Sequence, residues 1–410
     1  MLSQKTIDIV KSTAPILDEH GEALTKHFYK RMFSHNPEVL PFFNPANQAE
    51  GTQQRALAAA ICAYAANIDN LEVLGSAVEL IAHKHVSLQI KPEHYPIVGQ
   101  NLLSSIREVL GEGATDDVIG AWGEAYGFLT DILTGREAQI YKESAEKDGG
   151  WSGFRSFKID RKEQESSLIT SFYLKPEDGG ALPDYLPGQY ITLRVPTKNG
   201  STTMRNYSLS DVAGLDYLRI SVKKEAAPQA KTPNGYVSHL LHEEKSVGDK
   251  VELAAPCGEF FLNPHDQHER PLVLLAAGVG ITPILSILKT ALAAMPERKI
   301  IFIHGVVNEA VQAFKPTIDA LSAQHDNLTV HYRYNDAAKN GATRAENCST
   351  GFVDAVLIES LVPDRHADYY FCGPKPFMIN IYQDLLKWGI PSTQTHFEFF
   401  GPREALEEAA

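Results

Sequence analysis

Two short segments in the second half of the chain carry residue types suited to a phosphorylated ligand. The segment Arg205-Asn206-Tyr207-Ser208 places a cation and two hydroxyl groups within four residues of an expected strand. A guanidinium can pair with a pyrophosphate, and the hydroxyls suit a planar, hydroxyl-rich group such as a flavin nucleotide. The segment Ala277-Gly278-Val279-Gly280-Ile281-Thr282 follows an apolar run and opens a helical pattern. It predicts a strand, a glycine turn and a helix N-terminus, whose N–H groups can approach a phosphate. Such a turn alone also has a purely steric explanation.

The elements that position these segments follow two different periodicities. From Phe154 the apolar period is two, with strands separated by Pro, Gly and Asp turns, as in a small antiparallel barrel. These strands are expected at 154–161, 168–174, 189–195, 205–210, 217–224 and 250–254, with one helix starting at 233–235. Farther on, strands alternate with helices, which is typical of a doubly wound parallel sheet. Those strands are expected at 272–276, 299–304, 328–333, 368–372 and 396–400.

The first 147 residues predict helices only, because apolar residues recur at spacings of three and four and strand alternation is absent. Helix breaks are expected at Pro15 and Gly21, among other Pro and Gly positions. Residues 147–150 form a turn-rich joint, and Trp151 is expected to anchor the next domain. We therefore expect a multidomain chain with an all-α domain at 1–147, an antiparallel β-barrel at 151–263 and an α/β domain at 264–410.

Composition excludes several classes of protein. The formal charge of −13 argues against a nucleic-acid partner or an anionic membrane surface, since both select for clustered cations. The uncharged stretch 271–288 contains prolines and glycines and is better explained as a buried strand and helix than as a membrane span. Four cysteines without CxxC spacing suggest free thiols in a reducing compartment. We expect a cytoplasmic protein without stable membrane association.

The two segments, followed later by Cys372-Gly373-Pro374, occur in an order that resembles the ferredoxin-reductase family of FAD and NAD(P)H modules. The resemblance implies FAD contacts at Tyr190, Arg205, Asn206, Tyr207 and Ser208. It implies dinucleotide contacts at Ala277, Gly278, Val279, Gly280, Ile281 and Thr282, with Ala277 where relatives usually have another Gly. The alternatives are that Tyr190 is an ordinary strand aromatic and Arg205 an exposed barrel charge.

In the helical domain, the segment from Lys84-His85 to His94-Tyr95 resembles the proximal heme side of the bacterial flavohemoglobins. The resemblance spans the whole chain and implies that His85 ligates the iron of a heme b. Tyr95 and Glu137 match positions that hydrogen-bond the second imidazole nitrogen and set its basicity. His83 is a competing ligand, and Glu137 could instead be a solvated surface acid.

On the other side of the heme, the resemblance assigns four positions. Tyr29 would donate a hydrogen bond to bound O₂, and Gln53 would add a polar contact. Leu57 would shape an apolar access path, and Phe43 would pack against the porphyrin. Ordinary core packing is the alternative for Tyr29, Leu57 and Phe43.

The activity that the resemblance implies is nitric oxide dioxygenation. NAD(P)H reduces FAD, FAD reduces the heme, and heme-bound O₂ converts NO to nitrate. No Arg or Lys appears between His304 and Lys315, which favours NADH over NADPH. Two alternatives stay open: an O₂-binding or O₂-sensing hemoprotein, and an NAD(P)H-flavin or ferric reductase.

The same resemblance singles out Lys84 and Glu398 as charges that tune the heme and flavin potentials. It also implies that the residues after Glu398 close over the flavin ring; these are Phe399, Phe400, Gly401 and Pro402. A monomer is expected, and a lipid ligand in the heme pocket is left open.

Overall fold

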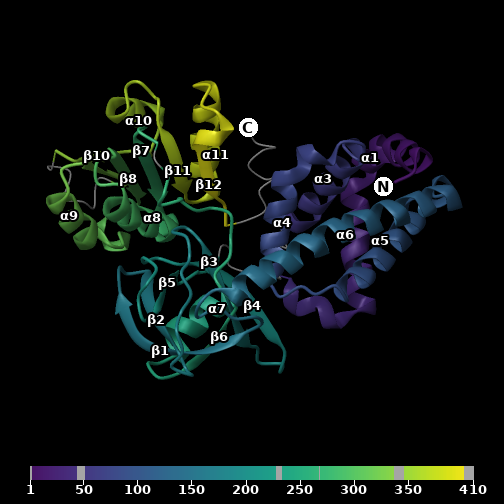
Figure 1. The fold of residues 1–410 in the computed structure, drawn as a ribbon, viewed down its shortest axis with the longest axis horizontal. Coiled ribbons are helices and arrows are strands. Elements are labelled where there is room, and N and C mark those ends of the chain that lie inside the picture. Colours follow the sequence, from purple (N-terminus) through teal and green to yellow (C-terminus); the bar gives the residue numbers. More distant parts are fainter. Residues whose placement is uncertain (1, 44–50, 228–232, 267, 337–345, 401–410) are drawn as a thin grey trace. The chain divides into compact units, whose positions relative to one another are not determined.

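The computed structural model describes residues 2–43, 51–227, 233–266, 268–336 and 346–400 (Figure 1). Residue contacts divide the chain into two units, one of residues 2–146 with 195–204 and one of residues 147–194 with 205–400. The second unit contains the α/β sheet and the barrel apart from residues 195–204. The division into three domains at 1–147, 151–263 and 264–410 therefore stays a prediction.

Residues 2–146, the main part of the first unit, are helical, as predicted. Its helices are α1 (Gln4–His35), α3 (Thr52–Ala66), α4 (Gly75–Ser87), α5 (His94–Leu110) and α6 (Asp116–Glu146), with the short 3-10 helices η1 (Pro37–Phe42), η2 (Leu71–Leu74) and η3 (Gly111–Gly113). Residues from α1, α3, α5 and α6 share one apolar core that includes Phe28, Met32 and Trp122.

The predicted breaks at Pro15 and Gly21 are wrong, because α1 is one continuous helix through both. Pro15 lies on the exposed side, where water can solvate the carbonyl that loses its helical hydrogen bond. Gly21 is buried, and a Cβ there would lie 3.2 Å from the Cβ of Ala58 on α3. This glycine allows α1 and α3 to pack closely and does not end the helix.

The second unit begins with an antiparallel barrel. Its strands are β1 (Arg155–Gln164), β2 (Ile169–Pro176), β3 (Tyr190–Pro196), β4 (Thr202–Ser208), β5 (Leu218–Lys223) and β6 (Lys250–Leu253), in the order β4-β3-β6-β1-β2-β5. A bridge between Leu209 and Ile220 joins the two ends of this order, which closes the barrel. The predicted helix is α7 (Tyr236–His239), continued by η4 (Leu240–Glu244). Trp151 anchors the joint as expected, donating to the carbonyl of Leu253 at 3.0 Å.

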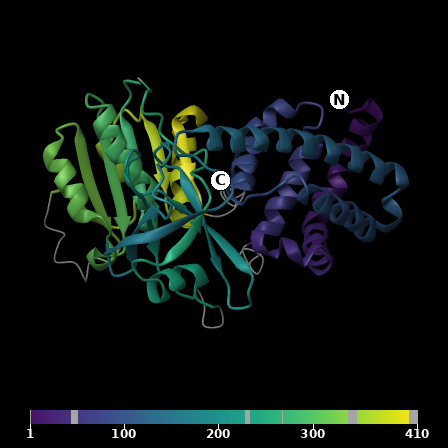
Figure 2. The ribbon, with the colours of Figure 1, turned by 60° about the horizontal axis from the view of Figure 1, so that its bottom comes forward.

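The α/β part is a parallel sheet with helices on both faces (Figures 1 and 2). Its strands are β7 (Leu272–Ala277), β8 (Ile300–Val306), β9 (Leu328–Tyr334), β10 (Cys348–Thr350), β11 (Asp368–Cys372) and β12 (Thr395–Glu398), in the order β10-β9-β8-β7-β11-β12. The helices are α8 (Ile281–Ala294), α9 (Lys315–Gln324), α10 (Ala355–Leu361) and α11 (Lys375–Lys387), with the short helices η5 (Gly278–Gly280), η6 (Glu309–Val311) and η8 (Ser392–Gln394). Residues of α8 and α9 pack on one face, and residues of α10 and α11 pack on the other. The strand β10 was not predicted, and the last strand ends at Glu398 and not at residue 400.

None of the helices in the described ranges combines the length and the hydropathy that crossing a membrane requires. The four cysteines are free thiols, as expected.

Candidate functional sites

Three helices bring His85, Tyr95 and Glu137 together in the helical unit. The Nδ1 atom of His85 on α4 lies 2.8 Å from Oε1 of Glu137 on α6. The hydroxyl of Tyr95, in the first turn of α5, donates to the same oxygen at 2.5 Å and lies 3.0 Å from Nδ1. Glu137 is only 2 % exposed, so its alternative as a solvated surface acid is wrong. Burial and the hydrogen bond to Glu137 raise the pKa of Tyr95, which keeps its hydroxyl a donor.

This arrangement fits a heme iron. Because Nδ1 donates to Glu137, the opposite nitrogen Nε2 is the one available as a metal ligand. The competing His83 has a different setting, with Nε2 3.8 Å from Glu79, and Glu79 is also bound by Arg136 at 2.6 Å. The geometry that orients an imidazole for ligation therefore belongs to His85 and not to His83.

Two tyrosines that the sequence did not single out stabilise the backbone next to this cluster. The hydroxyl of Tyr126 on α6 donates to the main-chain carbonyl of Tyr95 at 2.7 Å. Its ring occupies the space where a Cβ on Gly99 would be, 2.6 Å away. Tyr141, also on α6, donates to the carbonyl of Ile90 at 2.7 Å. A local sequence pattern carries no signal for these contacts, since they join residues that are far apart in the sequence.

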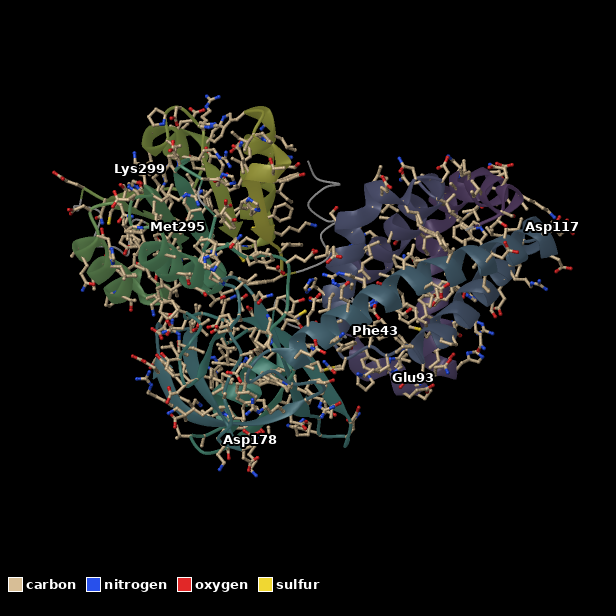
Figure 3. The ribbon with its side chains drawn as sticks, viewed as in Figure 1. Phe43, Glu93, Asp117, Asp178, Met295 and Lys299 are labelled. Carbon is tan, nitrogen blue, oxygen red and sulfur yellow. The ribbon has the colours of Figure 1, made fainter. Side chains whose placement is uncertain are left out.

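The residues predicted for the opposite side of the heme lie on α1, α3 and the segment after η1. Tyr29 on α1 is 6 % exposed, and its ring centroid lies 5.7 Å from that of Phe43, which is labelled in Figure 3. Burial raises the pKa of Tyr29, so its hydroxyl stays protonated and able to donate. Leu57 on α3 packs against the same apolar core, and Gln53 lies half-buried one turn before it.

The proposed flavin residues lie on two neighbouring barrel strands. On β4 side chains alternate, so Arg205 and Tyr207 share one face, while Asn206 and the buried Ser208 share the other. Asn206 accepts a hydrogen bond from Thr192 on β3 at 3.1 Å. Tyr190 begins β3 and is 7 % exposed; its ring lies where a Cβ on Gly258 would be, 2.7 Å away. A guanidinium beside a phenol on one strand face fits the pyrophosphate and ring of FAD.

The glycine turn has the predicted strand–turn–helix form. Ala277 ends β7, Gly278 has a φ of +53°, and α8 begins at Ile281. A Cβ on Gly280 would lie 2.1 Å from the carbonyl oxygen of Cys372, so only glycine fits there. The hydroxyl of Thr282 donates to the carbonyl of Val279 at 3.0 Å. The turn is thus packed on the end of β11, with the helix N-terminus that a phosphate requires.

The remaining predicted residues lie at the ends of elements. Glu398 pairs in register with Cys372, and its charge together with burial raises the pKa of that thiol. Phe399 packs on the α11 side of the sheet, and Phe400 is 52 % exposed. Lys84 is exposed on α4, directly before His85. Gly401 and Pro402 lie outside the described residues.

A buried histidine that the sequence did not assign supports the glycine turn. His304 on β8 is 0 % exposed, and its Nε2 donates to the carbonyl of Gly278 at 3.3 Å. Its Nδ1 has no hydrogen-bond partner. Burial lowers the pKa of His304 to about 4, so the imidazole is neutral in the folded protein at neutral pH.

We expect this histidine to make the second unit acid-sensitive. An unfolded histidine titrates near pH 6.5, so below that pH the unfolded chain binds the extra proton and the free energy of unfolding falls. Between pH 7 and pH 5 this one group should cost about 2 kcal/mol. The variant His304→Phe should therefore lose about 2 kcal/mol less over that range. Urea unfolding at both pH values, followed by flavin fluorescence, measures the difference. Parallel losses in both proteins would contradict the assignment.

Three family models match consecutive parts of the chain. The globin model matches residues 26–133, the oxidoreductase FAD-binding model residues 156–262, and the oxidoreductase NAD-binding model residues 274–384. The chain is therefore a globin joined to an FAD- and NAD-binding oxidoreductase module.

Relatives with this whole arrangement are flavohemoproteins. One from Halalkalibacterium halodurans is 48% identical, covering 99% of this chain and 98% of its own. Another from Rhodopirellula baltica is 47% identical and covers 99% of both. The crystal structure of a Malassezia yamatoensis flavohemoglobin with bound FAD and heme matches with a TM-score of 0.84 and 25% identity, over 98% of this chain and 100% of its own. The FAD/NAD-binding domain of a nitric oxide dioxygenase from Vibrio cholerae has a TM-score of 0.53 and 34% identity, over 60% of this chain and 99% of its own. The present chain belongs to the flavohemoprotein family.

Proposed function

We propose that the protein is a nitric oxide dioxygenase that uses NAD(P)H to convert NO and O₂ to nitrate. When bound, FAD supplies the conversion of a two-electron donor into single electrons, and the heme supplies the iron at which O₂ and NO react. The observation that carries this proposal is the His85–Tyr95–Glu137 cluster, in a chain that also contains the oxidoreductase module. The Vibrio cholerae protein described as a nitric oxide dioxygenase supports it through its similar module.

The proximal residues have a specific task in this proposal. Glu137 accepts the N–H of His85 and so makes the imidazole a stronger electron donor. A more basic ligand favours oxidative chemistry over reversible O₂ storage. Tyr95 shares the carboxylate and holds it in place through the 2.5 Å hydrogen bond.

The distal residues orient the reacting ligand. Tyr29 keeps its proton because it is buried, so its hydroxyl would donate to a ligand oxygen that carries partial negative charge. Gln53 adds a second polar group, Leu57 shapes the apolar access path, and Phe43 packs beside the ring of Tyr29.

In the second unit, Arg205 would pair with the flavin pyrophosphate, and Tyr190 and Tyr207 would contact the flavin ring. The N–H groups after Gly278 bind the nicotinamide dinucleotide phosphates at the start of α8. Phe399 and Phe400 would close over the flavin, and Lys84 and Glu398 would tune the potentials of the two redox groups.

The two alternatives predict different chemistry. A carrier or sensor of O₂ needs no continuous electron supply, whereas the present chain contains an oxidoreductase module. A plain flavin or ferric reductase needs no carboxylate-oriented histidine in its helical part.

An absorption spectrum followed by an activity assay tests the proposal. The purified protein should show a strong Soret band together with flavin absorption, and should consume NO in air only when NADH is present. A protein without a Soret band would be the plain reductase. A heme protein that binds O₂ but leaves NO unconsumed would be the carrier or sensor.

We also expect NADH to be the preferred donor. The segment from His304 to Asn308 lacks the cation that a ribose 2′-phosphate requires. The KM for NADH should therefore be lower than the KM for NADPH in steady-state flavin reduction. Equal KM values, or a lower one for NADPH, would refute this preference.

A further inference from the structure

Asp211 lies in the sequence between the two proposed cofactor segments of the second unit. It contacts both the barrel and helix α8 of the α/β part. It follows Ser208 of β4 by three residues and is 3 % exposed. Its main-chain carbonyl accepts a hydrogen bond from Ser286 on α8 at 2.7 Å. Its carboxylate oxygen Oδ1 forms an ion pair with Lys289, also on α8.

The barrel holds the same aspartate from the opposite side. Nη1 of Arg219 on β5 lies 3.2 Å from Oδ2, and the Tyr217 hydroxyl donates to Oδ2 at 3.2 Å. The hydroxyl of Tyr185 donates to the main-chain carbonyl at 2.9 Å. Arg219 also donates to Ser210, so the residue before Asp211 is fixed as well.

Burial makes these contacts hard to rearrange. The side chains of Asp211 and Arg219 are 4 % and 8 % exposed, and Lys289 is 26 % exposed. Removing one partner of a buried ion pair leaves the other charge uncompensated, which costs far more than losing a surface pair. Glu165 lies near the same group of charges. Ser171 donates a hydrogen bond to Glu165 at 2.5 Å and also bonds Ser221 on β5. The position of α8 against the barrel is therefore set by charge compensation as well as by apolar packing.

The helix that Asp211 holds is the one that begins at the glycine turn. Ser286 and Lys289 are three residues apart, so they lie on one face of α8. Ser286 is 0 % exposed and lies six residues after Gly280. A short path thus runs from Tyr207 and Ser208 through Asp211 to α8 and its N-terminal turn.

We propose that Asp211 is a positioning residue for hydride transfer. It fixes the position of the dinucleotide, whose phosphates would bind at the glycine turn, relative to the flavin that β4 would hold, and so sets the distance between the nicotinamide and flavin rings. This inference rests on the proposed function, because it concerns the reaction NADH + FAD + H⁺ → NAD⁺ + FADH₂, in which a hydride (two electrons and one proton) passes directly between the rings and the second proton comes from solvent. Asp211 touches neither ring and acts through α8.

A positioning role predicts a loss in rate rather than in affinity. A displacement of about 1 Å between reacting atoms can slow a reaction about 100-fold. The glycine turn itself is unchanged in an Asp211 variant, so nucleotide binding should change little. We expect Asp211→Asn and Lys289→Met to lower the limiting rate of flavin reduction about 10- to 100-fold, with the NADH dissociation constant within about threefold.

Anaerobic stopped-flow with the full-length protein carrying heme and FAD separates the two quantities. Flavin absorbance is followed at a series of NADH concentrations. Lys289→Arg retains the charge and should restore most of the rate. Lys223→Met is the matched control, because Lys223 on β5 pairs with Glu225 in a partly exposed contact, and the variant should behave as the unaltered protein.

A measurement without turnover complements the kinetics. Amide hydrogen exchange of residues 278–290, recorded without nucleotide, should be faster in Asp211→Asn and unchanged in Lys223→Met. If the charge variants do not retain FAD, Ser286→Ala tests the inference instead. This variant removes one neutral hydrogen bond to the main-chain carbonyl of Asp211 and should still lower the limiting rate severalfold.

The outcomes distinguish this inference from the proposed function. Unchanged limiting rates in the variants that retain FAD would overturn the inference, as would a rise in the dissociation constant without a loss in rate. If NADH does not reduce the flavin of the unaltered protein while dithionite does, the proposed function fails first.

Discussion

Replacing His85 with Ala is expected to abolish heme binding and to leave NADH-driven flavin reduction intact. The imidazole is oriented by two neighbours, at 2.8 Å from Glu137 and 3.0 Å from Tyr95, and alanine supplies no ligand. The flavin and dinucleotide segments lie in the second unit and share no residue with this cluster. The Soret absorbance of the purified variant should be lost, and its flavin should bleach with NADH as in the unaltered protein.

The matched control for this variant is His83→Ala. Burial lowers the pKa of His83, and its Nε2 atom lies 3.8 Å from the Glu79 carboxylate, so its loss should spare the Soret band. A protein that loses heme on replacement of His83 and keeps it on replacement of His85 would reverse the assignment.

Replacing Tyr29 with Phe is expected to speed O₂ dissociation from the reduced protein about tenfold or more. The hydroxyl is buried and protonated, and a hydrogen bond to a partly charged acceptor contributes roughly 1.5–3 kcal/mol. Phenylalanine keeps the ring contacts with Phe28 and Phe43, so packing changes little.

Laser photolysis or stopped-flow measures this rate directly. The matched control is Tyr64→Phe in the same unit, since the Tyr64 hydroxyl donates to the carbonyl of Ala125 and has no assigned role at the heme. An O₂ dissociation rate that Tyr29→Phe leaves unaltered would exclude Tyr29 as the donor.

The sequence predicted the elements whose pattern is local. Alternating residues located the six barrel strands, and the switch to strand–helix alternation located most of the parallel sheet. The strand β10 was missed because its three residues, Cys348 to Thr350, carry no apolar period. Pro15 and Gly21 were misinterpreted because their effect depends on solvent exposure and on Ala58, which lies on another helix.

The candidate sites were predictable to a different extent. The resemblance assigned His85, Tyr95 and Glu137, and the structure brings these three together, although their roles stay a proposal. From residue types alone His83 and His85 are equivalent, and only the packing of α4, α5 and α6 separates them. Asp211 and Lys289 are 78 residues apart, so no local pattern relates them. A buried ion pair has no signature in sequence spacing, so the sequence singled out neither residue.

The apolar core beside the α/β sheet includes residues of the barrel part, and this affects how the second unit unfolds. Phe260 and Leu262 follow the last barrel strand, yet they are buried in the same apolar cluster as Leu272 and Leu274 of β7. Heat or urea that opens the barrel must therefore also expose the core of the sheet. The barrel and the α/β sheet should unfold in one cooperative transition. A protease that cut the chain at the predicted boundary, between residues 263 and 264, would leave neither fragment with a complete interior.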